Sequence, residues 1–413
     1  MLMPLASVAR RPALAHSAGW RREWTQTWRG DYCKRHFTLL LPWAFTISSA
    51  RTRVLGTRLE RRCIHIPTVL LPPVLFTALL LGLWTWKCFM LVVFQNKIIY
   101  MPGFPPTARR ETIADYARLC RGIEWREETT KASDGTRLGL AVATVPLPSG
   151  GVQKGGNEMP PADVYVLYFQ GNASSTPPRL PDISSVLRLV SDDKAARPMH
   201  GSLTFVCLSY RGYWTSRGRP SERGIRLDAE AGVRWTVENH GRKFPGGAGG
   251  CGPILILWGQ SIGSGVATNL AASTPIPAGI PVRGMLLETP FLSVRAMLEV
   301  LYPQKWLPYK HLWPFLRNHL DSWTNLGIIA ETSRSTGQKM PNIYILEADR
   351  DELVPKEHGD QLYRRCLDLG IPVEKGAAPV AFHSEAIARG EGKKLAAQAI
   401  VSLAEKALDD TSG

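Results

Sequence analysis

Short apolar runs recur along most of the chain, separated by segments with a helical pattern. The runs are nearly continuous, rich in β-branched residues, and cover residues 164–170, 203–209, 254–258, 282–288 and 342–348. Runs of this length are typical of strands buried on both faces of a parallel sheet. The helical segments between and after them are 224–239, 262–272, 293–301, 357–368 and 393–408. Strands that alternate with helices predict a doubly wound α/β domain.

Two other kinds of segment surround this alternation. Residues 124–146 predict an initial antiparallel hairpin with its turn at Asp134-Gly135. The Gly/Pro-rich stretches 147–161 and 244–253 predict surface loops. They lack the strand–loop–helix setting with a Lys-Ser/Thr pair that cradles phosphate, so we assign them no ligand.

The apolar stretch 67–95 is too long for a buried strand. Pro67 to Trp86 are twenty residues without a charge. A helix from Pro73 to Phe94 would be about 33 Å long, enough to cross a bilayer core. Lys87 lies toward its far end, where its stem can extend to the headgroups. The alternative is a buried core helix, but such a helix is rarely apolar all round. We therefore predict a transmembrane anchor.

The net charge of +15 is spread unevenly along the 413 residues, because residues 1–62 hold twelve basic and three acidic residues. A basic chain raises the possibility of a nucleic-acid partner, but no zinc-ligand spacing, RNA-binding aromatic motif or basic helix is present. The seven cysteines are widely spaced without a C-x-x-C pair, which fits neither a disulfide framework nor a metal site. We expect neither nucleic acid nor metal as a partner.

Residues 1–66 precede the anchor. The first 22 are Arg-rich and free of acid, which resembles a mitochondrial transit peptide. The alternative, which we prefer, is a disordered basic arm over residues 1–66. By the positive-inside rule this arm would be cytosolic, and residues 96–413 would form a catalytic domain facing a lumen or the exterior. Lys97, Arg109 and Arg110 weaken that asymmetry. The expected location is an endomembrane or the plasma membrane, with a single span.

The motif G-x-S-x-G occurs where the run 254–258 ends, as Gly259-Gln260-Ser261-Ile262-Gly263. A strand before Ser261 and a helix after it are the setting of a nucleophile elbow, in which the serine lies on a strained turn. The small glycines let the strand and helix approach closely. We predict that Ser261 is a nucleophile and that the N–H of Ile262 faces the oxyanion. The alternative is a polar residue in an ordinary Gly-rich loop.

An acid and a base should follow such a serine in that order. Asp349 and Asp351 both follow the 342–348 strand, at the edge of the sheet where sites of this fold lie. His383 lies in a loop before the last helix, whereas His358 is only seven residues past Asp351 and too close to turn back. We predict His383 as the base and prefer Asp351 as the acid, because Pro355 and a helix fix its loop.

A second oxyanion donor is expected from the loop after the third strand. The sequence "YFQGNASS", residues 168–175, occupies that place. Gly171 allows a tight turn, and the N–H of Asn172 could point at the same position as that of Ile262. The alternative is that Gly-Asn is simply a turn.

These motifs together resemble the α/β-hydrolase superfamily, and more narrowly its membrane-anchored α/β-hydrolase-domain proteins, which include protein depalmitoylases. The resemblance covers residues 70–408 and rests on "NKIIYMP" (96–102), "YFQGNAS", "SYRGYWTSRGRPSERGIRLDAEA" (209–231), "GQSIGSGVA" and "DELVPKEHG" (351–359). It implies that Ser261 is the nucleophile, Asp351 the acid and His383 the base. Gln170 stands where a His is usual, and Trp214 where a Gly is common.

The expected function is acyl transfer to water from an ester or thioester, without a metal or organic cofactor. The resemblance favours a palmitoyl-protein thioesterase that acts beside the bilayer on an acylated protein. The alternatives are a lipid or small-ester hydrolase, a soluble mitochondrial hydrolase, and a non-catalytic membrane protein that uses the same fold for binding. Residues 291–340, rich in Leu, Trp, Tyr and basic residues, are expected to select the substrate, although ordinary helix packing explains them equally well.

Overall fold

A computed structural model describes residues 67–147, 162–193, 199, 201–245, 252–273 and 280–412. The predicted basic arm and transit peptide lie outside the described residues, as do residues 148–161 and 246–251 of the two predicted loops.

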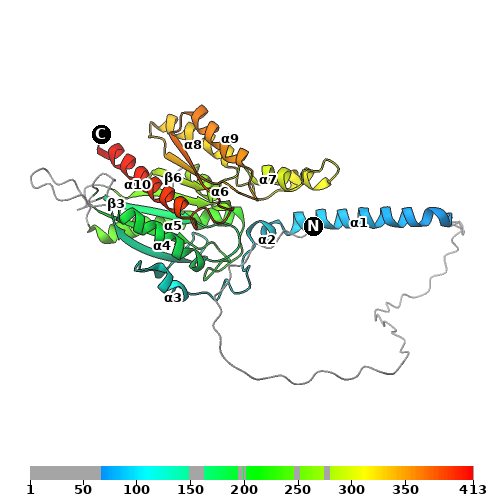
Figure 1. Cartoon of the computed structure of the whole chain (residues 1–413), viewed down its shortest axis with the longest axis horizontal. Coiled ribbons are helices and arrows are strands. Elements are labelled where there is room, and N and C mark those ends of the chain that lie inside the picture. Colours follow the sequence, from blue (N-terminus) through cyan, green and yellow to red (C-terminus); the bar gives the residue numbers. More distant parts are fainter. Residues whose placement is uncertain are drawn as a thin grey trace, which may run out of the picture. The chain divides into compact units, whose positions relative to one another are not determined.

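The core of the domain is a β-sheet, to which the labelled strands β3 and β6 belong (Figure 1). The sheet has eight strands in the order β1-β2-β4-β3-β5-β6-β7-β8. From β3 to β8 every neighbouring pair is parallel, whereas β2 is antiparallel to both β1 and β4. The strands are β1 Arg126–Lys131, β2 Arg137–Pro146, β3 Ala162–Phe169, β4 Gly201–Leu208, β5 Ile254–Gln260, β6 Val282–Glu288, β7 Asn342–Ala348 and β8 Val373–Ala378.

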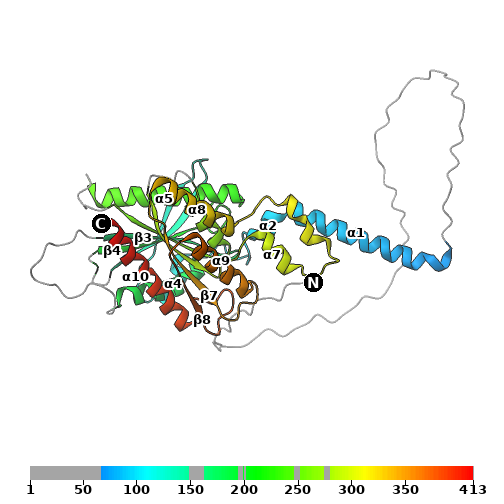
Figure 2. The ribbon, with the colours of Figure 1, turned by 90° about the horizontal axis from the view of Figure 1, so that it is seen from above.

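Helices lie on both faces of the sheet (Figure 2). One face packs against α5 (Glu222–Lys243), α6 (Ile262–Ala271), α8 (Ser322–Thr336) and α9 (Lys356–Leu369). The other face packs against α4 (Leu180–Ser191) and α10 (Gly390–Ser412). The remaining helices are α1 (Leu71–Val93), α2 (Gln95–Tyr100), α3 (Ile113–Tyr116) and α7 (Val294–Leu301), with short 3₁₀ turns at Thr68–Leu70, Ala117–Cys120, Pro177–Arg179 and Pro308–Phe315.

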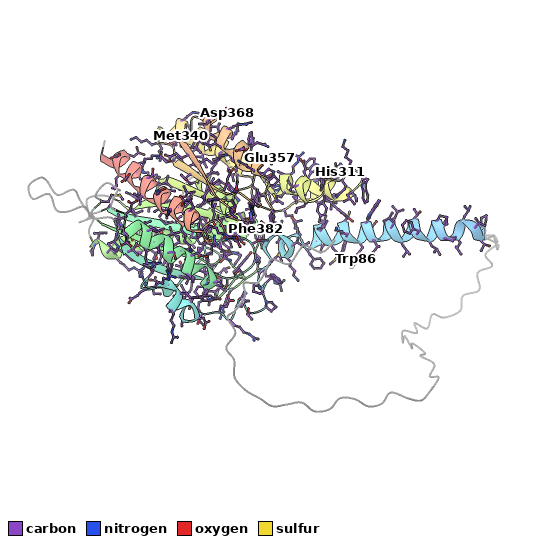
Figure 3. The ribbon with its side chains drawn as sticks, in the orientation of Figure 1. Trp86, His311, Met340, Glu357, Asp368 and Phe382 are labelled. Atoms are coloured by element: carbon purple, nitrogen blue, oxygen red, sulfur yellow. The ribbon has the colours of Figure 1, made fainter. Side chains whose placement is uncertain are left out.

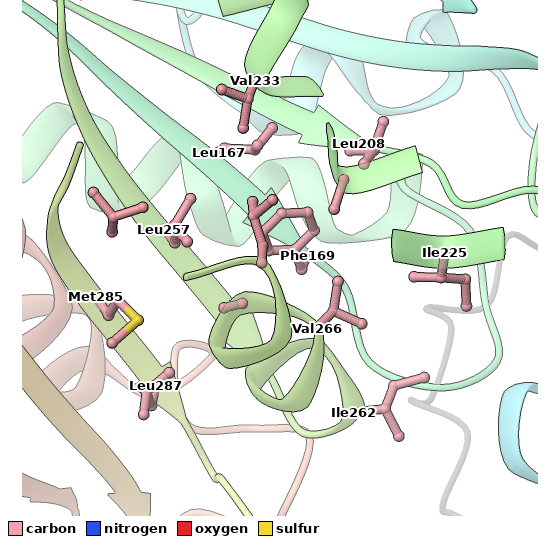
Figure 4. Packing of buried hydrophobic residues seen from close by; sticks show 14 of the residues in the cluster. Leu167, Phe169, Leu208, Ile225, Val233, Leu257, Ile262, Val266, Met285 and Leu287 are labelled. Atoms are coloured by element: carbon pink, nitrogen blue, oxygen red, sulfur yellow. The ribbon is translucent and has the colours of Figure 1, made fainter. Parts of the chain in front are cut away.

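The continuous apolar runs exist because both faces of the sheet are covered. Along β3, Tyr165, Leu167 and Phe169 belong to the cluster under α5 and α6, which Figure 4 shows from close by. Their neighbours Val164, Val166 and Tyr168 belong to the cluster under α4 and α10. Successive side chains of a strand point to opposite faces, so a strand buried on both faces needs apolar residues at every position.

The five strands and five helices predicted from the sequence, and the hairpin turned at Asp134-Gly135, are present in the structure, whereas α4, α8 and β8 were not predicted. β8 is one of the two edge strands of this sheet. It is partly exposed and has the sequence Val-Glu-Lys-Gly-Ala-Ala, so it carries no apolar run. α4 starts at Leu180-Pro181, and α8 contains Gly327. A proline in the first turn and a glycine inside a helix both weaken the helical pattern of the sequence, but neither prevents a helix from forming.

Helix α1 begins two residues before the predicted Pro73, and Pro72 and Pro73 lie in its first turn. Their missing N–H groups cost nothing there, because those donors have no partner inside the helix. The described chain contains one helix, Thr68–Val93, that is long and apolar enough to cross a membrane. None of its residues is fully buried, in contrast to a core helix of a soluble domain.

Candidate active site

Ser261 lies on the sharp turn that joins β5 to α6. Its φ of 52° and ψ of −116° are strained for a residue with a side chain. A Cβ at Gly263 would lie 2.0 Å from the carbonyl oxygen of Phe169, and one at Gly259 would lie 2.2 Å from that of Gly263. The turn therefore closes only with glycine at both positions. The N–H of Ser261 donates to the carbonyl oxygen of Glu288 at 2.8 Å, which ties the turn to β6.

We expect Gly263→Ala to destabilise the domain, because its methyl group would overlap the backbone of β3 rather than the end of a flexible side chain. Overpacking of a core typically costs about 1–3 kcal/mol, and more where backbone must move. Urea unfolding followed by circular dichroism measures this loss. Gly241→Ala is the matched control, since a Cβ there meets no atom within 4 Å. A Gly263→Ala midpoint equal to the control's would contradict this account of the turn.

The structure brings Ser261, Asp351 and His383 together, although they are far apart in the sequence. His383 Nε2 lies 2.9 Å from Ser261 Oγ, and His383 Nδ1 lies 2.7 Å from Asp351 Oδ2. The serine and the histidine are 8% and 6% exposed, so both are largely shielded from water. A nucleophile hydrogen-bonded to a base, which is in turn oriented by an acid, is the arrangement of a catalytic triad.

The geometry favours Asp351 over Asp349 as the acid. The second oxygen of Asp351, Oδ1, accepts hydrogen bonds from the N–H groups of Leu353 and Val354 at 2.9 and 2.8 Å. These bonds fix the carboxylate while Oδ2 faces the histidine. Asp349 is exposed. The neighbouring Glu352 accepts a hydrogen bond from the backbone N–H of His383 at 3.0 Å and so holds the histidine loop.

His358, the other histidine after the acid, is buried on α9, and burial lowers its pKa. Its Nδ1 has no hydrogen-bond partner among the described residues. Of the two histidines, His383 is the one whose ring nitrogen lies within hydrogen-bond distance of Ser261 Oγ.

The loop after β3 lies beside the serine, and Gly171 and Asn172 line the same cleft as Ser261 and His383. Two successive residues of the loop, Ala173 and Ser174, have positive φ values of 58° and 61°. Ile262 is the first residue of α6, where the N–H groups have no partner inside the helix. The two backbone groups predicted as oxyanion donors therefore flank Ser261, and their role stays a prediction.

Gln170 supports this loop from below. Its Oε1 accepts from Thr176 Oγ1 at 3.1 Å, its Nε2 donates to the carbonyl oxygen of Ala173 at 3.4 Å, and its own carbonyl oxygen accepts from Tyr210 at 2.9 Å. Gln170, at the position where a histidine is usual, therefore stabilises the conformation of the loop through these hydrogen bonds. Gln260 of the elbow lines the cleft and accepts from Tyr168 at 3.0 Å.

The segment after helix α1 also holds the loop. The N–H of Ala173 donates to the carbonyl oxygen of Tyr100 at 3.0 Å, and that of Ser174 donates to the carbonyl oxygen of Phe104 at 2.5 Å. Tyr213 donates from its hydroxyl to the same oxygen of Tyr100. Through these bonds the segment 96–104, which contains the sequence "NKIIYMP", connects α1 directly to the wall of the cleft.

An ion pair beneath the site was not predicted from the sequence. Glu288, fully buried at the end of β6, pairs with Arg179 at 2.5 Å and accepts from Trp258 Nε1 at 3.0 Å. Arg179 also donates to the carbonyl oxygen of Ser384, next to the histidine, at 2.9 Å. Burial alone would lower the pKa of Arg179, but the Glu288 carboxylate raises it, so the guanidinium group stays charged. The sequence feature that could have indicated this pair is a glutamate at the end of the apolar run Met285–Leu287.

The long segment 209–231 is held by another ion pair. Arg211 donates to both oxygens of Asp228 through its backbone N–H, Nε and Nη2 at 2.7–2.9 Å. Its Nη1 reaches Asp134 in the hairpin turn at 2.8 Å, and this hydrogen bond lowers the pKa of Asp134 to about 2. Trp214, buried with a φ of 36°, donates from Nε1 to the carbonyl oxygen of Glu111. This segment is therefore structural.

The cleft over Ser261 has a volume of about 270 Å³. Its walls include the polar side chains of Gln170, Arg179, Asp182, Gln260 and Ser384 in addition to Ser261, His383 and residues 171–175 of the loop after β3. It can hold an ester group with a small polar head. Among the described residues, no group of three His, Cys, Asp or Glu side chains could hold a metal ion.

Comparisons with known proteins find several similar chains. The human protein ABHD12B is 32% identical over 163 residues, and lysophosphatidylserine lipase ABHD12 of Danio rerio is 32% identical over 158 residues. These matches cover 40% and 38% of this chain, and the chain spans about two fifths of the length of these relatives. The α/β hydrolase domain-containing protein WAV2 of Arabidopsis thaliana is 27% identical over 67% of this chain and 77% of its own.

Among solved structures, an α/β hydrolase from Vibrio vulnificus aligns over 75% of this chain and 92% of its own, with a TM-score of 0.51 and 19% identity. A search against models of protein families finds no match. The shared architecture confirms the predicted fold.

Proposed function

Since the chain belongs to the α/β-hydrolase superfamily, we propose that it is a membrane-anchored serine hydrolase that cleaves a carboxylic ester of a lipid. The observation that carries this proposal is the continuous hydrogen-bonded row from Asp351 through His383 to Ser261, below a cleft lined by Asn172. Such a row activates a serine hydroxyl for attack on a carbonyl carbon.

The reaction would proceed in two acyl transfers. Ser261 Oγ attacks the ester carbonyl while His383 Nε2 takes its proton, and Asp351 holds the imidazole in the correct tautomer and stabilises its charged form. The protonated His383 then gives its proton to the leaving alcohol, which departs and leaves the acyl group on the serine. Water, deprotonated by the same nitrogen, attacks the acyl-enzyme and releases the fatty acid.

The charge that develops on the carbonyl oxygen needs donors that are already oriented. The N–H groups of Ile262 and Asn172 would serve, one from a helix N-terminus and one from the strained loop. Losing one such donor typically costs about 2.7–4 kcal/mol of transition-state stabilisation. The bonds from the loop to Tyr100 and Phe104 would keep the second donor in place before substrate binds.

A lipid ester is favoured as substrate over a water-soluble one for two reasons. The apolar helix α1 leads through α2 directly into the segment that holds the oxyanion loop. The relative from Danio rerio is named as a lysophosphatidylserine lipase. An acyl-protein thioesterase is the second candidate, supported by the sequence motifs that resemble the depalmitoylases; the same triad would expel a cysteine thiol.

The products released in vitro separate these candidates. The purified full chain in phosphatidylcholine vesicles would be given a long-chain lysophospholipid, a monoacylglycerol and an S-palmitoylated peptide, with Ser261→Ala as the blank. Release of fatty acid from either lipid, at a rate well above that from the peptide, supports the lipid hydrolase. Preferential cleavage of the peptide supports the thioesterase. If none of the three substrates is cleaved in a Ser261-dependent way, the proposed function is contradicted.

We expect the full-length chain to resist alkaline carbonate extraction from membranes, because α1 would span the bilayer. A chain starting at Gln95 keeps the bonds of that residue to the domain and should be extracted. Immunoblots of pellet and supernatant measure this. Extraction of the full-length chain would contradict a spanning helix.

Protease protection tests the predicted orientation, in which the catalytic domain lies on the lumenal or exterior side. In sealed vesicles the domain should be protected from protease until detergent is added. Digestion without detergent would place it in the cytosol.

A further inference from the structure

One side of the second half of α1 is covered by the segment that joins β6 to α8. We call residues 289–321 the cap segment; it contains α7 and the 3₁₀ turn Pro308–Phe315. The half-buried positions of α1 include Leu80, Trp84, Lys87 and Leu91, spaced three or four residues apart along one face of the helix. Residues 71–79 have no such face, since all of them are exposed.

Aromatic contacts join the two elements. The rings of Trp84 and Trp306 lie with their centroids 5.7 Å apart. The ammonium group of Lys87 lies 4.3 Å from the ring centroid of Tyr309 and 5.1 Å from that of Tyr302. An ammonium group over aromatic faces is stabilised by their quadrupoles where water is scarce. The one charge within α1 is therefore held by the cap segment.

Hydrogen bonds fix the end of α1 to the same segment. Arg317 Nη2 donates to the carbonyl oxygens of Val92 and Val93 at 3.0 and 3.1 Å. Gln95 Oε1 accepts from the backbone N–H of Arg317 at 2.7 Å, and its Nε2 donates to the carbonyl oxygen of Phe315 at 3.1 Å. A cation at a helix C-terminus satisfies carbonyl groups that have no partner inside the helix. The cap segment and α1 thus form one packed unit.

The uncovered part of α1 is too short to cross a bilayer. Residues 68–83 of the Thr68–Val93 span, which precede the contact of Trp84 with the cap segment, make about 24 Å of helix at roughly 1.5 Å per residue. A hydrocarbon core is about 30 Å thick. A bilayer crossed by α1 must therefore extend about 6 Å past Trp84, to the level where the cap segment lies beside the helix.

The cap segment exposes apolar and basic side chains, as a segment at the membrane interface requires. Leu301, Trp306, Trp313 and Phe315 are 45–66% exposed. Residues 301–317 hold Lys305, Lys310 and Arg317 and no acid. Trp is enriched at membrane interfaces, Lys and Arg extend to the headgroups, and a basic surface is attracted to anionic lipids. Trp86 projects from α1 into open space while His311 lies on the cap segment beside the helix (Figure 3).

We propose that the cap segment, through the apolar surface of residues 301–315, is immersed in the leaflet on the catalytic side of the membrane. The bilayer is the partner that covers this surface. The inference rests on the proposed anchor and deepens the proposed function: the catalytic domain is seated on the membrane through its cap, and substrate passes from the leaflet to the cleft without crossing bulk water.

Photolabelling tests the immersion without any need for catalysis. The full chain would be reconstituted in phosphatidylcholine vesicles that contain a phospholipid with a diazirine on its acyl chain, and labelled peptides would be mapped by mass spectrometry. We expect label on residues 301–315 as well as on 71–83, and none on α9. Label that continues along α1 through residues 84–93 while 301–315 stay unlabelled would overturn the inference. Label on neither segment would overturn both the inference and the anchor.

A pair of substitutions tests the consequence for activity. Leu301→Asp with Phe315→Asp places two carboxylates on the immersed surface. We expect the rate on a long-chain lysophospholipid in vesicles, divided by the rate on a short-chain p-nitrophenyl ester, to fall about tenfold, equivalent to about 1.4 kcal/mol. The control is Leu367→Asp on α9, which is 54% exposed and next to Asp368, a residue that Figure 3 shows away from α1.

The two tests separate the inference from the proposed function. An unchanged ratio in the double variant, with folding verified by circular dichroism, would overturn the role of the cap in delivering substrate. A wild-type chain that cleaves neither substrate contradicts the proposed function, whereas photolabelling of residues 301–315 still reports on the immersion.

Discussion

Replacing Ser261 with alanine is expected to abolish covalent labelling by a fluorophosphonate probe and to lower turnover of a short-chain ester about 10⁶-fold, the loss measured when the serine of a protease triad is removed. The physical reason is that this hydroxyl is the group placed to attack. It lies 2.9 Å from His383 Nε2, on a turn that holds it at the wall of the cleft. In-gel fluorescence measures the labelling and an absorbance assay the turnover.

The control for this variant is Ser384→Ala. Ser384 lines the same cleft and follows the histidine. Its backbone carbonyl oxygen accepts a hydrogen bond from Arg179, and this bond does not involve the hydroxyl that the substitution removes. This variant should keep its labelling. Circular dichroism should show that both variants are folded, since removing one hydroxyl leaves the glycine packing of the elbow intact. Undiminished labelling of Ser261→Ala would contradict the assignment of the nucleophile.

The fold was largely predictable because its central strands are buried on both faces. A strand such as β5 needs an apolar residue at every position, and a run of that kind is visible without knowing its partners. The edge strand β8 needs no such residues, so its polar sequence did not reveal it. Tertiary pairing with β7 gives it its structure, and this cannot be read from local pattern.

The candidate site was predictable for a related reason. Ser261 and Asp351 follow strands whose carboxyl ends meet at one edge of the sheet, so their order in the chain fixes their place in space. Arg179 and Glu288 were not predicted, because they act through a contact with each other across 109 residues of sequence. Arg179 lies in the turn before α4, and Glu288 lies at the end of β6. No spacing in the sequence indicates that pair. The same holds for Lys87, whose partners Tyr302 and Tyr309 belong to the cap segment.

Asp351→Asn is expected to be nearly inactive, whereas Asp349→Asn should keep most of its activity. The two aspartates are two residues apart beyond the same strand and carry the same substitution. A difference between the variants therefore reports on where each carboxylate lies relative to His383. Asp351 Oδ2 lies 2.7 Å from His383 Nδ1, and Asp349 is exposed. An asparagine in place of Asp351 cannot stabilise the imidazolium and favours the wrong tautomer, which costs about 10⁴ in turnover in the best-studied serine protease.

The measurement is the turnover number of both purified variants on a short-chain p-nitrophenyl ester. In Asp351→Asn the amide oxygen can take over the bonds that Asp351 Oδ1 accepts from the N–H groups of Leu353 and Val354, so the loop should stay folded. A selective loss in Asp349→Asn would reverse the assignment of the acid and leave the hydrolase proposal in place. Near-normal rates in both variants would contradict the Ser–His–Asp mechanism itself, because the imidazole would then be oriented by something other than a carboxylate.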